Sequence, residues 1–218
     1  MTDRHGIPSM TAAVVLESLT KLGATWRVGL AVECGSWLGA TCAALAAGLV
    51  RAGYDRPIHC FDQWRATWSE VRKAGEAGVR IEPGQNLEPL FRANVTPTYP
   101  DLVTHRGPIQ GAKWTGEPIA FFLLDGAKTE PAFSATLRTF GPSWVPGLTV
   151  VGLLDYFYWQ KQIGPRLREH YRNQARFVET HEDSFRLMRG WYGLSSAIFR
   201  YEAPIDWSTV SPDLVSTP

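Results

Sequence analysis

The sequence predicts an α/β fold built on a doubly wound, mostly parallel sheet that ends in an antiparallel hairpin. A strand ending at Glu33 turns through glycines into an alanine-rich helix near Ala40, as parallel strands with crossover helices do. Apolar strands that end in an acid then recur along the chain. Finally, two predicted strands, 175–181 and 194–201, are separated by a connection too short for a helical crossover, which favours a hairpin.

The length and composition are those of one globular domain. A chain of 218 residues with 44% hydrophobic and 20% charged residues can bury a substantial core. We place a single domain at residues 11–205, between an irregular N-terminal tail, 1–10, and a C-terminal tail, 206–218. The formal net charge of +1 gives no electrostatic reason to expect nucleic acid or a membrane surface as a partner.

The cysteines and the start of the chain favour a cytoplasmic protein. Cys34, Cys42 and Cys60 form neither a CxxC motif nor a Cys/His metal-ligand spacing. The first residues lack the pattern of a signal peptide, and no apolar run approaches the roughly 20 residues that span a bilayer. We therefore expect a reducing cytoplasm, with neither nucleic acid nor membrane as a partner.

The first half of the domain alternates helices and strands. Residues 11–22 are predicted to form a helix with Thr11 as its N-cap, and residues 41–52 a helix that stops at Gly53. After these come a strand at 57–62, a variable surface element at 63–85, a short helix at 86–95 and a strand at 101–105.

The second half begins with the segment 119–125, IAFFLLD. It is apolar up to its final acid, as a central parallel strand covered on both faces should be. A helix is predicted at 131–140 and a strand at 148–155. An amphipathic helix at 159–173, interrupted at Gly164-Pro165, then precedes the two strands of the hairpin.

The turn from Glu33 to Gly39 has the features of a nucleotide-type cofactor site. Small residues let a ligand approach the backbone, the helix N-terminus offers unpaired N–H groups, and Glu33 can accept hydrogen bonds. Because glycine turns between strands and helices are common, an ordinary turn explains the same residues equally well.

Asp62 ends the strand that follows the alanine-rich helix. Its distance from Glu33 along the chain suits one strand, helix, strand unit, so both acids are expected at the same edge of the sheet. Asp62 could there accept hydrogen bonds from both hydroxyls of a ribose. Capping of the following turn is the alternative.

Four predicted strands end in an acid, namely Glu33, Asp62, Asp125 and Asp155. In a parallel sheet these ends lie along one edge, where doubly wound folds bind ligands. Like charges so close together repel one another unless a ligand, a metal ion or a base compensates them. The sequence therefore predicts a crevice for a cationic or hydroxyl-rich ligand.

These segments resemble the class I S-adenosylmethionine-dependent methyltransferases, over roughly residues 11–203. The resemblance lies in VECGSWLGATCAAL, HCFDQW, FFLLDGAK and VPGLTVVGLLDYF, and it points to the small-molecule O-methyltransferases related to macrolide-sugar methyltransferases and cephalosporin-hydroxylase-like proteins. It implies a Rossmann-like, seven-stranded sheet whose last two strands form an antiparallel hairpin. It also implies methyl transfer from S-adenosylmethionine to a small molecule, at a hydroxyl oxygen.

The resemblance further implies where S-adenosylmethionine would bind. The motif after the first strand would hold its methionine end, the acid after the second strand its ribose, and the loop after the third strand its adenine. Trp37 stands where many members carry a middle glycine, so the backbone turn must differ there. The implied cofactor residues are Glu33, Gly35, Ser36, Trp37, Gly39, Asp62, Gln63, Gly107, Pro108 and Asp125.

The segment from Asp125 to Lys128 resembles the DxxK motif of metal-dependent catechol-type methyltransferases. There the acid binds a divalent ion, and the lysine deprotonates or orients the acceptor hydroxyl. The fifth strand of that group ends in Asp-Asn, and that of the macrolide-sugar group in Asp-Asp, whereas Asp155-Tyr156 supplies one carboxylate. Asp125 and Asp155 are therefore a thin ligand set for Mg²⁺, and metal dependence stays open.

Without a metal, methyl transfer needs an acceptor held in line and a base for its proton. Asp125 or Asp155 could be that base, with Lys128 stabilising the developing anion, and His105 and His181 are weaker candidates. The structural alternatives are a solvated Lys128 and an ordinary hydrogen-bonded His105.

Three functions were weighed against the sequence. The leading hypothesis is an S-adenosylmethionine-dependent O-methyltransferase acting on a small molecule. The alternative keeps the fold for another reaction or as a non-catalytic partner subunit. A nicotinamide-dependent oxidoreductase is disfavoured because the GxGxxG spacing is absent around Gly35 and Gly39. The identity of the acceptor and a homo-oligomeric state stay open.

Overall fold

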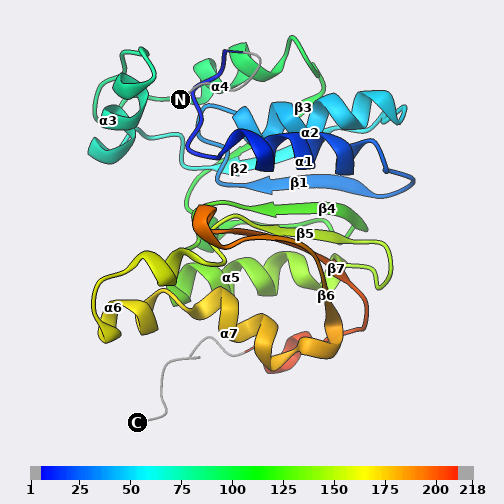
Figure 1. Ribbon diagram of the computed structural model, residues 1–218. Coiled ribbons are helices and arrows are strands. Elements are labelled where there is room, and N and C mark those ends of the chain that lie inside the picture. Colours follow the sequence, from blue (N-terminus) through cyan, green and yellow to red (C-terminus); the bar gives the residue numbers. More distant parts are fainter. Residues whose placement is uncertain (1–5, 211–218) are drawn as a thin grey trace. The chain divides into compact units, whose positions relative to one another are not determined.

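The computed structural model describes residues 6–210 of the chain. These residues form seven strands and seven α-helices, arranged as shown in Figure 1. The strands are β1 (Leu30–Cys34), β2 (Ile58–Asp62), β3 (Leu102–Arg106), β4 (Ile119–Leu124), β5 (Val150–Leu153), β6 (Phe185–Trp191) and β7 (Ser196–Tyr201). The helices are α1 (Ala13–Gly23), α2 (Ala40–Arg51), α3 (Trp68–Glu76), α4 (Glu88–Val95), α5 (Glu130–Phe140), α6 (Pro165–His170) and α7 (Asn173–Thr180).

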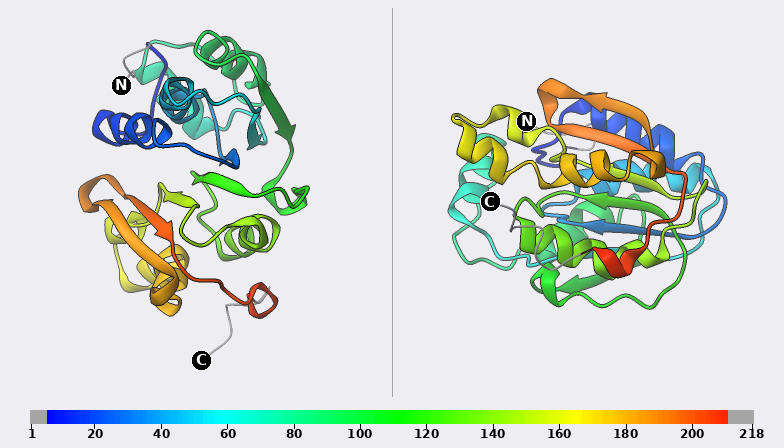
Figure 2. Two further views of the ribbon diagram at one scale, coloured as in Figure 1. Left: turned by 90° about the vertical axis from the view of Figure 1, so that its right-hand side faces the viewer. Right: turned by 90° about the horizontal axis from the view of Figure 1, so that it is seen from below.

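The strands form a mostly parallel sheet in the order β3-β2-β1-β4-β5-β7-β6. The pairs β2–β3, β1–β4 and β4–β5 are parallel, and β7 pairs antiparallel with both β5 and β6. This confirms the predicted α/β fold with its seven-stranded sheet and C-terminal hairpin, which Figure 2 shows from two further sides.

The described chain divides into two compact units. The first unit contains the residues up to Arg27 together with Ser36–Gly107. In it α1 and α2 run side by side (Figure 1), because their facing residues are small. A Cβ added to Gly23 would lie 2.5 Å from the carbonyl oxygen of Leu45, and one on Gly48 would lie 2.1 Å from that of Thr20. The helix backbones therefore pack against each other directly.

The second unit contains Val28–Gly35 and the residues from Pro108 onward. All residues of β1, β4 and β5 are buried, as predicted for central strands covered on both faces. Aromatic rings fill the core: Trp144 packs against Phe122 and against Trp207. Residues 206–210, which the sequence assigns to a C-terminal tail, thus contribute the half-buried Trp207, whose ring contacts this core. The rest of that tail, 211–218, lies outside the described residues.

The first strand predicted for the hairpin, 175–181, is wrong. These residues belong to α7, and β6 begins only at Phe185. Their apolar spacing fits an extended strand, but Ala175, Phe177 and Val178 are buried residues of a helix. The ring of Phe177 packs against that of Phe133 in α5.

Two local predictions also differ from the structure. Thr11 is not the N-cap of α1, since Ala12 takes that position without a side-chain hydrogen bond. Within the predicted surface element 63–85, a capping box forms instead: Thr67 accepts the backbone N–H of Glu70, whose side chain accepts that of Thr67. This box starts α3.

None of the helices within residues 6–210 has both the length and the hydropathy that a membrane crossing requires.

Candidate functional site

The turn after β1 is fixed by a close approach of backbone in the second unit. Gly35 has a φ of +89°, and a Cβ there would lie 1.5 Å from the carbonyl oxygen of Asp125. The N–H of Asp125 donates to the carbonyl of Cys34 at 2.8 Å, so the segments that follow β1 and β4 are in direct backbone contact. Glu33, one residue earlier, is only 1% exposed. Glycine is therefore required at position 35 whether or not a ligand binds there.

In the first unit, Asp62 is a meeting point for three predicted cofactor segments. One carboxylate oxygen accepts the N–H of Trp37 at 2.9 Å, and the other that of Trp64 at 2.6 Å. The Asp62 carbonyl accepts the N–H of Gly107 at 2.9 Å. The turn after β1, the end of β2 and the end of β3 thus converge on one acid.

Asp62 compensates backbone strain in the two turns that it contacts. Trp37 and Trp64 both have a φ of +42°, a left-handed conformation that non-glycine residues rarely adopt. Hydrogen bonds to a carboxylate are among the stronger ones in proteins. The bond to Trp64 is also the turn-capping role that the sequence left as the alternative. Because a carboxylate has about four acceptor positions, Asp62 retains capacity for two ribose hydroxyls.

The beginning of α2 offers unused polar groups to a ligand. The N-cap, Gly39, is left-handed and supplies no side-chain cap to the first turn of the helix. The Ser36 hydroxyl is buried, and among residues 6–210 no hydrogen-bond partner for it is found. Gln63 and Pro108 are exposed. A small polar ligand at this turn would satisfy groups that the protein alone leaves unpaired.

Asp155 and Lys128 form the second part of the predicted site, within the second unit. The Lys128 ammonium lies 2.8 Å from Asp155 Oδ2, which also accepts the N–H of Gly126 at 3.1 Å. Burial lowers the pKa of Lys128, but the charges of Asp155 and Asp125 outweigh it and raise the pKa above its ordinary value. The raised pKa favours the protonated, cationic form of Lys128.

Two residues that the sequence did not single out hold Lys128 in place. The Asn173 side chain donates to the Lys128 carbonyl at 3.1 Å, and the ammonium lies 5.2 Å from the centre of the Tyr158 ring. No motif marked either residue, and Asn173 opens α7, in a segment whose structure was predicted wrongly. The alternative of a solvated lysine is thus not what the structure shows.

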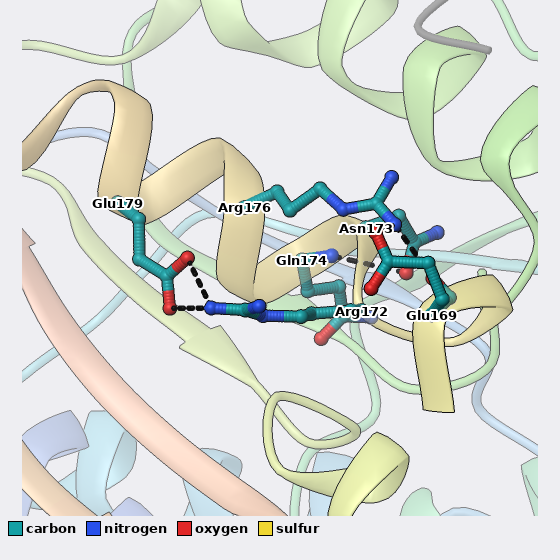
Figure 3. A network of polar contacts seen from close by, with 6 residues as sticks. All are labelled: Glu169, Arg172, Asn173, Gln174, Arg176 and Glu179. Atoms are coloured by element: carbon teal, nitrogen blue, oxygen red, sulfur yellow. Dashed lines mark hydrogen bonds and ion pairs between the residues drawn. The ribbon is translucent and has the colours of Figure 1, made fainter. Parts of the chain in front are cut away.

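A polar network surrounds Asn173 at the start of α7 (Figure 3). Arg172 donates to both carboxylate oxygens of Glu179, at 2.9 and 3.1 Å, and Arg176 pairs with Glu169 of α6. The Asn173 side-chain oxygen accepts the N–H of Gln174 at 3.0 Å. The Asn173 amide is therefore oriented at both of its ends.

The two histidines make ordinary contacts. His105 stacks on Phe61, with ring centres 4.0 Å apart, and its Nε2 lies 3.1 Å from His59 Nδ1. Burial lowers the pKa of His105. The Nδ1 of His181 lies 2.8 Å from the Phe177 carbonyl. These contacts agree with the structural alternative for His105.

Comparison with known proteins then places the fold. No protein-family model and no curated protein matches the sequence. Among solved structures, the O-methyltransferase NovP is similar with a TM-score of 0.64 and 15% identity, over 90% of this chain and 83% of NovP. The chain has the fold of an O-methyltransferase.

Two other solved structures share this methyltransferase fold. One is CalS11, a TDP-rhamnose 3′-O-methyltransferase of calicheamicin biosynthesis, with a TM-score of 0.51 and 15% identity over 86% of this chain and 77% of CalS11. The other is the methyltransferase PaMTH1 of Podospora anserina with bound SAH, with a TM-score of 0.54 and 8% identity over 88% of this chain and 80% of PaMTH1. At these identities the likeness shows the fold alone.

On this methyltransferase fold, the residues at the ends of β4 and β5 do not fit a divalent metal ion. Within the described part of the chain, no group of three His, Cys, Asp or Glu side chains close enough to bind a metal includes Asp125 or Asp155. Asp155 is already paired with the Lys128 cation. Mg²⁺ requires oxygen ligands in nearly ideal octahedral geometry, and this ligand set supplies too few of them.

Proposed function

We propose that this protein transfers a methyl group from S-adenosylmethionine to a hydroxyl oxygen of a small molecule. The fold shared with O-methyltransferases supports this function. The observation that carries it is the convergence of Trp37, Asp62 and Gly107, because each belongs to a segment assigned to the cofactor. The Ser36 hydroxyl, buried without a partner among residues 6–210, supports the same assignment.

S-adenosylmethionine, when bound, supplies a methyl group attached to a positively charged sulfur. We assign its methionine end to the turn after β1 and its ribose to Asp62, whose carboxylate retains free acceptor positions. The proposed set is Glu33, Gly35, Ser36, Trp37, Gly39, Asp62, Gln63, Gly107, Pro108 and Asp125. Buried and strand-end carboxylates would also favour a cationic ligand electrostatically.

On the acceptor side, we assign the chemistry to Asp125, Lys128 and Asp155. The acceptor oxygen forms a bond to the methyl carbon, and its proton passes to the Asp125 carboxylate. The Lys128 cation stabilises negative charge on that oxygen as the proton leaves. Asp155 acts as a positioning residue, because it holds the ammonium at 2.8 Å.

A small molecule is the proposed acceptor, and the cytoplasm the proposed compartment. CalS11, one of the similar structures, acts on a TDP-sugar hydroxyl, which agrees with a hydroxyl-bearing acceptor. The formal net charge of +1 supports a small molecule over nucleic acid. All three cysteines are buried, and within residues 6–210 none of them forms a disulfide, which agrees with a reducing compartment.

Calorimetric titration with S-adenosylhomocysteine tests the cofactor assignment. We expect the wild-type protein to bind it in the micromolar range and Asp62→Ala to bind none. Ser36→Ala should keep the free energy of unfolding, because the hydroxyl has no partner among residues 6–210, but should weaken binding about fivefold through one lost hydrogen bond.

Ser195→Ala is the matched control, since Ser195 also carries a buried hydroxyl without a hydrogen-bond partner among residues 6–210. It should leave the affinity unchanged. No binding by the wild-type protein would refute the cofactor assignment. If the cofactor binds but labelled methyl groups reach no acceptor in a cell extract, with Mg²⁺ or with chelator, the repurposed-fold alternative is favoured.

A further inference from the structure

We propose that Lys128 is the resident cation of this site, and that its ion pair with Asp155 takes the place of a divalent metal ion. The inference rests on the proposed function only for its consequence in catalysis, because the ion pair itself is a property of the protein. The sequence left metal dependence open, and the DxxK resemblance implied a metal-binding acid beside a lysine that acts on the acceptor. The structure pairs this lysine with Asp155, the second candidate metal-binding acid.

The Asp155 carboxylate already has two partners in the structure. Its Oδ2 accepts hydrogen bonds from the Lys128 ammonium at 2.8 Å and from the N–H of Gly126 at 3.1 Å. The Asp155 side chain is only 10% exposed, so its orientation is fixed by these two donors. A divalent cation at the same oxygen would have to displace Lys128 or accept the repulsion of its charge.

The residue after Asp155 does not supply the missing metal ligand. In the metal-dependent groups that the sequence resembles, an amide or a second carboxylate stands at this position. Here it is Tyr156, whose ring packs edge-on against Phe157 and Phe199, with centres 4.7 and 5.0 Å apart. Tyr156 therefore supplies neither a carboxylate nor an amide oxygen at this position of the sequence.

Both the backbone and the ammonium of Lys128 have partners within the second unit. Asn173, only 5% exposed, donates to its carbonyl, and the N–H of Lys128 donates to the Gly126 carbonyl at 2.8 Å. The Tyr158 ring lies beside its ammonium. The first two contacts fix the backbone of Lys128, and Asp155 and Tyr158 position its ammonium for the acceptor.

In the proposed reaction this cation does the work that a metal ion would do for the acceptor. The acceptor oxygen forms its bond to the methyl carbon as the carbon–sulfur bond breaks, and that electron pair stays on sulfur. The hydroxyl proton passes to Asp125. Lys128 keeps its own proton throughout and lowers the cost of charge on the oxygen.

Titration with Mn²⁺, followed by the EPR signal of the unbound ion, tests the inference without any turnover. Wild type and Asp155→Asn should bind equal amounts of Mn²⁺. Lys128→Gln should gain no Mn²⁺ either, because Asp125 and Asp155 alone supply too few oxygen ligands for a divalent ion. Lys161→Gln is the control, because Lys161 is an exposed lysine outside the site.

One Mn²⁺ bound by the wild type and lost in Asp155→Asn would overturn the proposal, because Asp155 would then hold a metal ion. Circular dichroism verifies that each variant is folded. Once an acceptor is found, chelator should leave the methyl-transfer rate unchanged, and Lys128→Arg should retain more activity than Lys128→Gln. If no methyl transfer is found at all, the proposed function fails, whereas the Mn²⁺ result still decides this inference.

Discussion

Gly35→Ala should destabilise the protein far more than a glycine replacement with the same backbone cost. The matched control is Gly53→Ala: Gly53 has a φ of +76°, close to the +89° of Gly35, but a Cβ there meets nothing within 4 Å. Both variants pay about 1–2 kcal/mol for an L-residue in the left-handed region. Only Gly35→Ala brings its new atom to 1.5 Å from the Asp125 carbonyl oxygen.

The additional cost follows from what must move to relieve that overlap. A carbon and an oxygen need roughly 3.3 Å in ordinary contact, so the segments around Gly35 and Asp125 must separate by well over an ångström. Separation breaks the Asp125 to Cys34 hydrogen bond and opens the buried β1–β4 interface. A lost hydrogen bond with a buried polar group costs about 1–3 kcal/mol, and a cavity costs further.

We therefore expect a loss of about 4 kcal/mol or more in the free energy of unfolding for Gly35→Ala, against about 1–2 kcal/mol for Gly53→Ala. Urea denaturation, followed by circular dichroism and tryptophan fluorescence, measures both. Since domains are stable by about 5–15 kcal/mol, Gly35→Ala should lie close to unfolding. Equal losses in the two variants would refute the argument, because they would show that backbone conformation alone requires the glycine.

Three further predictions concern packing, capping and charge. Trp207→Ala should lower the free energy of unfolding by about 3–5 kcal/mol in urea denaturation, since its ring fills the space above Gly141; no change would show that residues 206–210 are a free tail. Thr67→Ala should cost only about 0.5–2 kcal/mol by the same measurement, through loss of the capping box with Glu70; a Thr67→Ser variant should restore most of it. The folded-state pKa of Lys128 is raised, so its ion pair contributes stability that is fully present below the ordinary lysine pKa near 10.5 and is lost as pH rises through the folded-state pKa. The difference in the free energy of unfolding between wild type and Lys128→Gln should therefore be constant from about pH 7 to 9.5. A steady decline of this difference across that range would contradict the assignment.

Most of the fold could be predicted because its signals are local. The apolar segment that became β4 is long enough and uniform enough to identify a buried strand, and the glycine turn before Ala40 marks the start of α2. The hairpin was predicted in kind but misplaced, because short apolar spacings such as Ala175, Phe177 and Val178 fit a strand or a helix face equally well.

The candidate site divides in the same way between sequence and tertiary structure. The sequence by itself determined the residue types at the strand ends, because the acids and glycines that follow the apolar segments can be identified from their order along the chain. Only the tertiary structure decided their pairing: Trp37 and Trp64 adopt left-handed backbones that Asp62 compensates, and Lys128 meets Asp155, which lies 27 residues further along the chain. Such pairings depend on which strands lie next to each other and on how much water the packing excludes, and neither is recorded in the spacing of residues along the chain.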